Sequence, residues 1–297
     1  MQTFIEIIKA VVFGIVEGVT EWLPVSSTGH MILLNDLIPL NVSAEFYKLF
    51  EVVIQLGAIL AVILLFWGKL WPFKKRSAVP KRVDRDIAGD ALPSGTSIWK
   101  PGALVMWIKI VIAVFPAAVV GILFDDTADK LFYHPIPVAV ALIVVGAAFI
   151  IVESTITKGK EPRVKRIADM SFIDALLVGI FQVFSAVFPG TSRSGSTIIG
   201  GLCIGLSRKT ASEFSFFLAV PVMFAASLLK TVKFLATGTA ITGLETAILV
   251  TGTITAFVVS LFVIGFLMDF IRKHDFKIFG WYRIALGIIV IIYSFIR

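Results

Sequence analysis

Charged residues are scarce in this sequence of 297 residues: Asp, Glu, Lys and Arg make up 16% of it, whereas they make up about a quarter of a typical soluble domain. Hydrophobic residues make up 58%, and the mean hydropathy is +0.95. Several apolar runs approach the roughly 20 residues that a helix needs to cross a bilayer. The runs lack the apolar–polar alternation of outer-membrane barrels, which excludes that class. We therefore predict an all-α polytopic membrane protein.

Cysteine is almost absent, and acidic residues are fewer than basic ones. The single Cys203 excludes an intramolecular disulfide, and we expect it to be a small packing residue. In a soluble protein, a net charge of +7 would suggest a nucleic-acid partner. Here the basic residues gather in loops, so membrane topology explains them better, and we expect no nucleic-acid partner.

Six full-length spans are predicted within one integral membrane domain, 1–297. They lie near 50–68, 103–124, 136–153, 211–233, 243–268 and 280–296. The polar loop 69–100 and the shorter loops 158–166 and 272–277 are basic, and we place them in the cytoplasm. The connection 125–130 is acidic, which places it outside, and the last span then leaves the C-terminus outside as well.

Two further apolar segments, 4–38 and 172–206, are interrupted by polar residues and proline. We predict re-entrant helical hairpins, because irregular backbone at membrane depth must be buried in protein or line a wet cavity. The two segments resemble each other, with Pro24 matching Pro189. In the predicted alignment Ser26 falls on Thr191, and Ser27 on Ser192.

An odd number of crossings separates the two hairpins, so the second copy is inverted relative to the first. We predict an inverted-topology repeat, with repeat one at about 4–68 and repeat two at about 172–233. Such repeats bring broken helices together near the bilayer midplane, where transporters bind their substrates.

The first hairpin carries EGVTEWLPVSSTGH, from Glu17 to His30. Glu17 and Glu21 are i and i+4, so they share one helix face. Two buried carboxylates need compensation by a divalent cation, a proton or a basic partner. Pro24 stops the helix, and we predict that Ser27 or Thr28 caps the next one.

The second hairpin carries FPGTSRSGST, from Phe188 to Thr197, and supplies the opposite charge. Its hydroxyls, glycines and following helix N-terminus are typical of an anion site. Arg193 adds a planar fork of donors that suits phosphate. Joined, the two hairpins predict a site for a phosphorylated ligand with a metal ion, and its place in the bilayer indicates a lipid tail.

Simpler interpretations compete with this one. Glu17, Glu21 and Arg193 can form a purely structural ion pair, although intramembrane charges are functional by default. The hydroxyls of Ser26, Thr191 and Ser196 are expected mainly to satisfy the backbone of broken helices. Two polar residues that open a span near the first hairpin, Glu51 and Gln55, are held as candidate supporting groups. A proton- or sodium-coupled transporter or a lipid flippase is the rival function, because it too uses inverted repeats and paired acids.

At these two hairpins the sequence resembles the undecaprenyl-diphosphate phosphatase family, the bacitracin-resistance integral membrane phosphatases of bacteria. FEVVIQLGAILAV from Phe50 and FSFFLAVP from Phe214 support the resemblance. It implies hydrolysis of undecaprenyl diphosphate to undecaprenyl phosphate and inorganic phosphate, which recycles the lipid carrier of cell-wall precursors. It also implies a multi-pass protein of the bacterial plasma membrane, six spans, two re-entrant hairpins and an active site facing the periplasmic side. A homodimer is left open.

The resemblance implies roles for individual residues. Glu17 and Glu21 would bind the divalent cation, Mg²⁺ or Ca²⁺, or orient the catalytic group. The candidate catalytic residues are Ser27, His30, Glu21 and Arg193. The candidate substrate-binding residues are Arg193, Ser192, Thr197, Ser26 and Thr28.

Three mechanisms stay open on the sequence. Ser27 attacks the terminal phosphorus while His30 takes its proton, or His30 itself attacks, or a metal-bound water attacks. We favour Ser27 with His30 as base, because i and i+3 at a helix start permit contact. In each version Arg193 neutralises charge on the transferring phosphoryl group.

Overall fold

The computed structural model describes residues 2–73 and 100–296, and these residues form helices joined by turns and short loops, with an isolated bridge between Val164 and Leu206. The helices are α1 (Gln2–Thr20), α2 (Ser27–Leu37), α3 (Ala44–Leu65), α4 (Trp67–Leu70), α6 (Pro101–Phe132), α7 (Pro135–Ile151), α8 (Phe172–Val187), α9 (Arg193–Cys203), α10 (Arg208–Ala236), α11 (Gly243–Phe270) and α12 (Lys277–Ile296). A π-helical turn, Val152–Ile156, extends α7, and a 3₁₀ turn, Ile167–Asp169, precedes α8. The all-α prediction is confirmed. Most of the predicted polar loop 69–100 lies outside the described residues.

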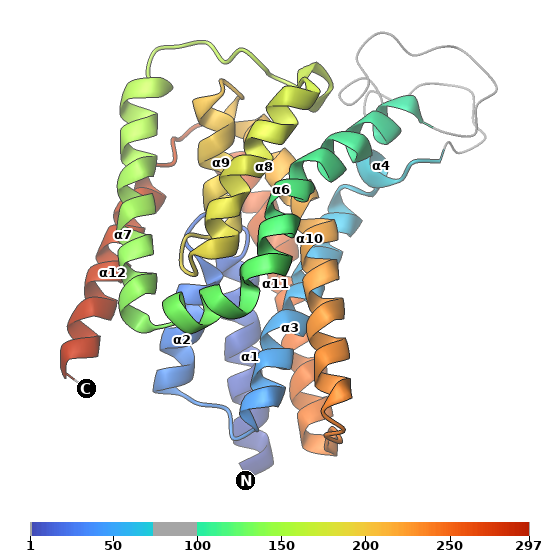
Figure 1. The fold of residues 1–297 in the computed structure, drawn as a ribbon, viewed down its shortest axis with the longest axis vertical. Helices are drawn as coiled ribbons and strands as arrows, with labels where there is room; N and C mark the ends of the chain where they lie inside the picture. The colour runs from blue at the N-terminus through green and yellow to red at the C-terminus, as the bar shows by residue number, and fades with distance from the viewer. Residues whose placement is uncertain (1, 74–99, 297) are drawn as a thin grey trace.

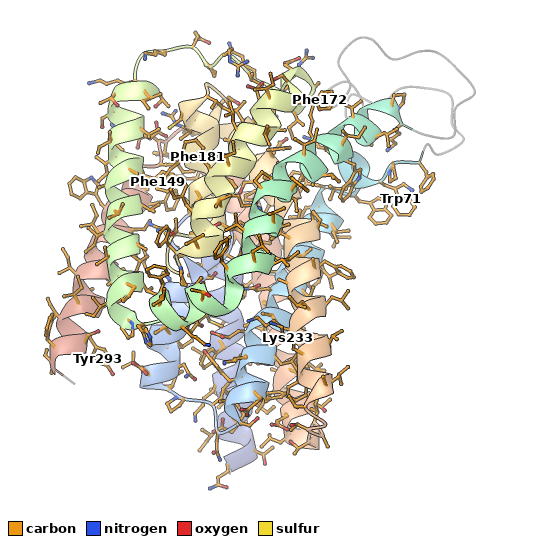
Figure 2. The ribbon with its side chains drawn as sticks, viewed as in Figure 1. Trp71, Phe149, Phe172, Phe181, Lys233 and Tyr293 are labelled. Atoms are coloured by element: carbon orange, nitrogen blue, oxygen red, sulfur yellow. The ribbon has the colours of Figure 1, made fainter. Side chains whose placement is uncertain are left out.

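Six helices are long and apolar enough to cross a membrane, as predicted. They are Ala44–Leu65, Pro101–Phe124, Pro135–Ile156, Arg208–Ala236, Gly243–Phe270 and Lys277–Ile296. Apolar side chains project outward along the height of the bundle (Figure 2), and many large ones, including Phe115 and Phe262, are exposed. A soluble protein does not expose so much apolar surface, so this surface is the one that faces lipid. One expectation was wrong: the acidic run 125–130 is no loop, because α6 continues to Phe132.

The two interrupted segments each form a pair of helices joined by a short turn, α1 with α2 and α8 with α9. The two pairs enter the bundle from opposite ends, and their tips meet in its interior (Figure 1). Each tip breaks a helix inside the protein, so its free backbone groups need partners there.

An inverted correspondence relates the helices of the two halves. It pairs α1 with α8, α2 with α9, α3 with α10, α6 with α11 and α7 with α12. The packing of the helices is consistent with this correspondence. The contact of α1 with α11 has its equivalent in the contact of α8 with α6, and two pairs of corresponding helices, α3 with α10 and α7 with α12, pack on each other. The correspondence therefore runs beyond the predicted ranges 4–68 and 172–233.

The predicted alignment of the two tips is wrong by one residue. Ser26 caps α2 and Ser192 caps α9, with similar unusual φ angles of 74° and 70°. Ser26 thus corresponds to Ser192, and the predicted partner of Ser26, Thr191, precedes that position. Gly190, with φ of 91°, is the extra residue that follows the shared proline. Ser27 then corresponds to Arg193, the first residue of α9.

The close packing of α3 against α11 depends on a glycine, Gly57. A Cβ added at Gly57 would lie 2.2 Å from the carbonyl oxygen of Thr253 on α11. We expect Gly57→Ala to separate α3 from α11 and to lower the free energy of unfolding by about 1–3 kcal/mol. Thermal unfolding in detergent would measure this. Gly121→Ala on α6 is the control, because no atom lies within 4 Å of its added Cβ. Equal melting temperatures of the two variants would contradict the prediction.

Candidate active site

The tips of both hairpins are shaped by serine caps. The Ser26 hydroxyl accepts a hydrogen bond from the Gly29 amide at 3.4 Å, and Ser192 accepts one from Gly195 at 3.2 Å. The capping residue of α2 is therefore Ser26, and not Ser27 or Thr28 as predicted. A positive φ at a residue other than glycine is uncommon and is concentrated at functional sites. The caps leave Ser27 and Arg193 as the first residues of two facing helices.

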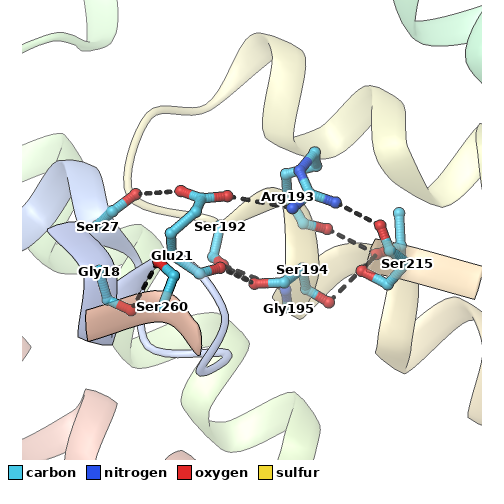
Figure 3. Close-up of polar contacts among 10 residues, drawn as sticks. Gly18, Glu21, Ser27, Ser192, Arg193, Ser194, Gly195, Ser215 and Ser260 are labelled. Atoms are coloured by element: carbon cyan, nitrogen blue, oxygen red, sulfur yellow. Dashed lines mark hydrogen bonds and ion pairs between the residues drawn. The ribbon is translucent and has the colours of Figure 1, made fainter. Parts of the chain in front are cut away.

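Glu21 joins the two hairpins (Figure 3). The Ser27 hydroxyl donates a hydrogen bond to Glu21 Oε2 at 2.8 Å, and Arg193 Nη2 lies 3.1 Å from Glu21 Oε1. The second guanidinium nitrogen of Arg193, Nη1, donates to the carbonyl oxygen of Ser215 at 2.7 Å. Glu21 is buried, with 6% of its surface exposed. A hydroxyl, a carboxylate and a guanidinium from both halves of the chain thus form one connected set.

Glu17 lies one helix turn before Glu21 and is 1% exposed. Its Oε1 atom is buried and has no hydrogen-bond partner in the described part of the chain. Glu17 lies close enough to Glu21 and to Glu51 for each of these carboxylates to repel a charge on Glu17. Tyr133 donates to both carboxylate oxygens of Glu51 at 3.3 Å. Glu51, which was only a candidate supporting group, therefore belongs to the surroundings of Glu17.

His30 does not contact Ser27 as the favoured mechanism requires. Its Nδ1 lies 2.7 Å from the carbonyl oxygen of Ser26, and its Nε2 lies 2.7 Å from the Tyr282 hydroxyl. The His30 and Tyr282 rings are stacked, with 4° between their planes. Both ring nitrogens are engaged, so the group placed to take the Ser27 proton is Glu21. Sequence reasoning missed Tyr282, because nothing in its apolar span marks it.

The hydroxyl groups predicted to bind substrate differ in the hydrogen bonds that they already make within the protein. Thr197 is fully buried, and its hydroxyl bonds the Arg193 carbonyl at 2.8 Å and Ser215 Oγ at 2.7 Å. Ser26 and Ser192 accept the capping bonds described above. Thr28 is half-buried in the first turn of α2. The structure thus gives Thr197, Ser26 and Ser192 a part in holding the tips, and their contact with substrate stays a prediction.

Sequence reasoning also missed Arg283. This arginine lies on α12, is 0% exposed, and donates hydrogen bonds to backbone carbonyls of both tips. One signal could have found it, because an arginine inside an apolar span is a functional candidate by default.

As a set, these groups suit phosphoryl transfer. Ser27 offers a nucleophilic oxygen, Glu21 a base in hydrogen-bond contact with it, and Arg193 a planar cation. Glu17 adds a carboxylate oxygen of the kind that Mg²⁺ and Ca²⁺ prefer.

Comparison with known proteins agrees with this chemistry. The sequence model of the family described as "Bacitracin resistance protein BacA" matches residues 10–289. A protein of Desulfitobacterium hafniense named undecaprenyl-diphosphatase is 53% identical over 98% of this chain and 97% of its own length. Undecaprenyl-diphosphatase 1 of Clostridium acetobutylicum is 51% identical over 98% of each chain. An undecaprenyl-diphosphatase of Enterococcus faecalis is 49% identical over 97% of each. These relatives give no support to the transporter alternative.

Proposed function

This chain belongs to the bacitracin resistance protein BacA family, and we propose that it hydrolyses undecaprenyl diphosphate to undecaprenyl phosphate and inorganic phosphate. The observation that carries the proposal is Glu21, which holds the Ser27 hydroxyl and the Arg193 guanidinium on its two oxygens. The reaction recycles a lipid carrier for peptidoglycan precursors, and the family description links such proteins to bacitracin resistance.

In the mechanism that the geometry favours, Ser27 is the nucleophile. Its oxygen attacks the terminal phosphorus while Glu21 Oε2, 2.8 Å away, takes its proton. The bond between that phosphorus and the bridging oxygen breaks, and undecaprenyl phosphate leaves. Water then attacks the phosphoserine, the bond between phosphorus and the Ser27 oxygen breaks, the proton held by Glu21 returns to that oxygen, and inorganic phosphate is released. Arg193 neutralises charge on the transferring group, and with Glu21 protonated it is free to turn toward the phosphate oxygens.

Glu17 would hold a divalent cation, Mg²⁺ or Ca²⁺, and Glu21, whose oxygens bond Ser27 and Arg193, would be a second ligand only while it is ionised. The fit rests on the unpartnered, buried Oε1 of Glu17 and on hard oxygen donors one helix turn apart. The described residues contain no cluster of three or more His, Cys, Asp or Glu that could hold a metal by itself. Mg²⁺ often has only one or two protein carboxylates and takes substrate phosphates as further ligands. Such a cation would supply charge neutralisation at the diphosphate.

The site would face the outer side of a bacterial plasma membrane. The basic loops 158–166 and 272–277 lie at the end of the bundle opposite to both termini (Figure 1). Basic loops stay in the cytoplasm. The first hairpin, which enters the bundle from the end that carries the N-terminus, then enters from the outer side. The lipid substrate reaches the site from the bilayer, and a homodimer stays a prediction.

Phosphate release from a long-chain prenyl diphosphate tests the proposal. We expect purified protein in detergent to release inorganic phosphate with Mg²⁺ or Ca²⁺, and chelation with EDTA to lower the rate by about 10²-fold or more. Restoring the cation should restore the rate, which separates removal of the metal from denaturation. If well-folded protein released no phosphate with any divalent cation, the proposed function would be wrong, and lipid flux in vesicles would be measured next.

A further inference from the structure

Arg283 connects both hairpin tips to the rest of the bundle. Its Nη2 donates hydrogen bonds to the carbonyl oxygens of Gly190 at 2.8 Å and Thr191 at 2.9 Å in the second tip. Its Nη1 donates to the carbonyl of Pro24 in the first tip at 3.2 Å, and its Nε donates to that of Leu142 on α7 at 3.4 Å. One side chain therefore fixes three segments relative to one another.

The charge of Arg283 is not compensated by an acid. Among the described residues it has no carboxylate partner, and the hydrogen bonds that it donates go to backbone carbonyls. Arg208 shows the ordinary arrangement, because its Nη2 lies 2.6 Å from the buried carboxylate of Glu153. A buried arginine without an acid is costly in a membrane protein, and such residues are usually functional.

Arg283 also lies against the candidate site. Its Nη1 lies 3.4 Å from the point that a Cβ on Gly195 would occupy, in the first turn of α9. The preceding residue, Tyr282, holds His30. The tip carbonyls that accept hydrogen bonds from Arg283, those of Pro24, Gly190 and Thr191, follow the C-terminal ends of α1 and α8. These are the negative ends of the two helices. The N-terminal amides of α2 and α9 are at the positive ends, which suit an anion.

We propose that Arg283 is a positioning residue for phosphoryl transfer and that its charge strengthens binding of the diphosphate. Through the carbonyls of Pro24, Gly190 and Thr191 it holds the two tips where Ser27 and Arg193 can act on one phosphoryl group. The inference rests on the proposed hydrolysis. The hydrogen bonds of Arg283 to the tips should then raise kcat, and its positive charge should lower KM for the diphosphate. Lysine keeps the charge but not the planar fork of donors.

The test uses Arg283→Lys, Arg283→Met and a matched control. Lys109 is likewise buried, 3% exposed, and donates only to backbone carbonyls, those of Ile167 at 2.9 Å and Ala168 at 3.2 Å, in a segment outside the site. Lys109→Met removes a comparable buried cation without touching the tips. For each variant we would measure the melting temperature, kcat and KM, and amide hydrogen exchange in 21–30 and 188–197.

We expect Arg283→Met to lower kcat/KM by about 10²-fold, with both a lower kcat and a higher KM. Arg283→Lys should return KM to within about threefold of the wild-type value while kcat stays about tenfold low. Both changes should speed amide exchange in the two tips together. Lys109→Met should lower the melting temperature. At temperatures where this variant is folded, its kcat, its KM and its rates of amide exchange in the two tips should match those of the wild type.

Two results would overturn the inference. One is a folded Arg283→Met protein with the kcat/KM of Lys109→Met, and the other is unchanged exchange at either tip. If Arg283→Met does not fold, Arg283→Lys decides, and wild-type kcat in that variant overturns the positioning role. If the wild type releases no phosphate, the proposed function fails separately, and amide exchange alone then decides whether Arg283 holds the tips.

Discussion

Arg193→Ala is expected to lower kcat/KM for phosphate release by at least about 10²-fold, because an arginine on a transferring phosphoryl group contributes factors of about 10³ or more. The structure places the guanidinium of Arg193 on the Glu21 carboxylate, 3.1 Å away. Arg193→Lys should recover only part of the rate, because lysine offers a point charge in place of a fork. Arg272→Ala is the control: that side chain is 62% exposed beside Asp269, and its loss should leave the rate unchanged.

Loss of stability must be separated from loss of chemistry in this test. Arg193→Ala leaves the buried Glu21 without its partner, which destabilises proteins by about 3–5 kcal/mol. The double variant Glu21→Gln/Arg193→Met removes both charges, so we expect it to melt at a higher temperature than Arg193→Met. It should still release phosphate at least about 10²-fold more slowly than the wild type. An active, stable double variant would show that the pair is only structural.

Ser27→Ala is expected to reduce kcat by about 10³-fold or more, since the proposed reaction passes through a covalent bond to Ser27. Acid quenching of the wild type during turnover should trap a phosphorylated peptide that contains Ser27, detectable by mass spectrometry. The variant should yield none. Ser294→Ala is the matched control, because the Ser294 hydroxyl bonds only the Val290 carbonyl, at 2.8 Å, near the end of α12.

Other outcomes of the Ser27 experiment point to the other mechanisms. Near-native turnover of Ser27→Ala would exclude Ser27 as nucleophile and favour attack by water. Phosphate trapped on His30 would instead favour the histidine mechanism. Glu21→Gln should lower the rate of phosphoserine formation, because the amide cannot take the proton that Ser27 Oγ now shares with Glu21 at 2.8 Å.

The sequence was sufficient to predict the membrane fold, because long apolar runs with few charged residues are what a helix needs to cross a bilayer. It also predicted that Glu21 and Arg193 meet, since each is costly alone at membrane depth and the two hairpins have opposite charge. The alignment of the tips was wrong because Gly190 adds a residue whose φ of 91° only the folded backbone reveals. The cap of α2 was also misplaced, because Ser26 takes the position expected for Ser27 or Thr28.

The contacts of His30 and Arg283 could not be read from spacing. His30 and Ser27 are near in sequence, but the first turn of α2 directs His30 toward Tyr282, a residue 252 positions away. Arg283 contacts backbone carbonyls, which every residue has. Its partners therefore cannot be predicted from complementary residue types in the sequence. Both cases show that helix α12, which has no polar motif, completes the site through tertiary packing.

The bond between Glu21 and Arg193 joins residues 172 positions apart, so its two ends leave the ribosome at different times. At a usual synthesis rate of about 5–20 residues per second, the first hairpin is complete roughly 10–30 s before its partner exists. During that interval its two carboxylates lack the arginine that makes them tolerable in hydrocarbon. The nascent hairpin is therefore expected to wait at the membrane surface until the second hairpin enters and Arg193 pairs with Glu21, and α10, α11 and α12 then complete the bundle and the site.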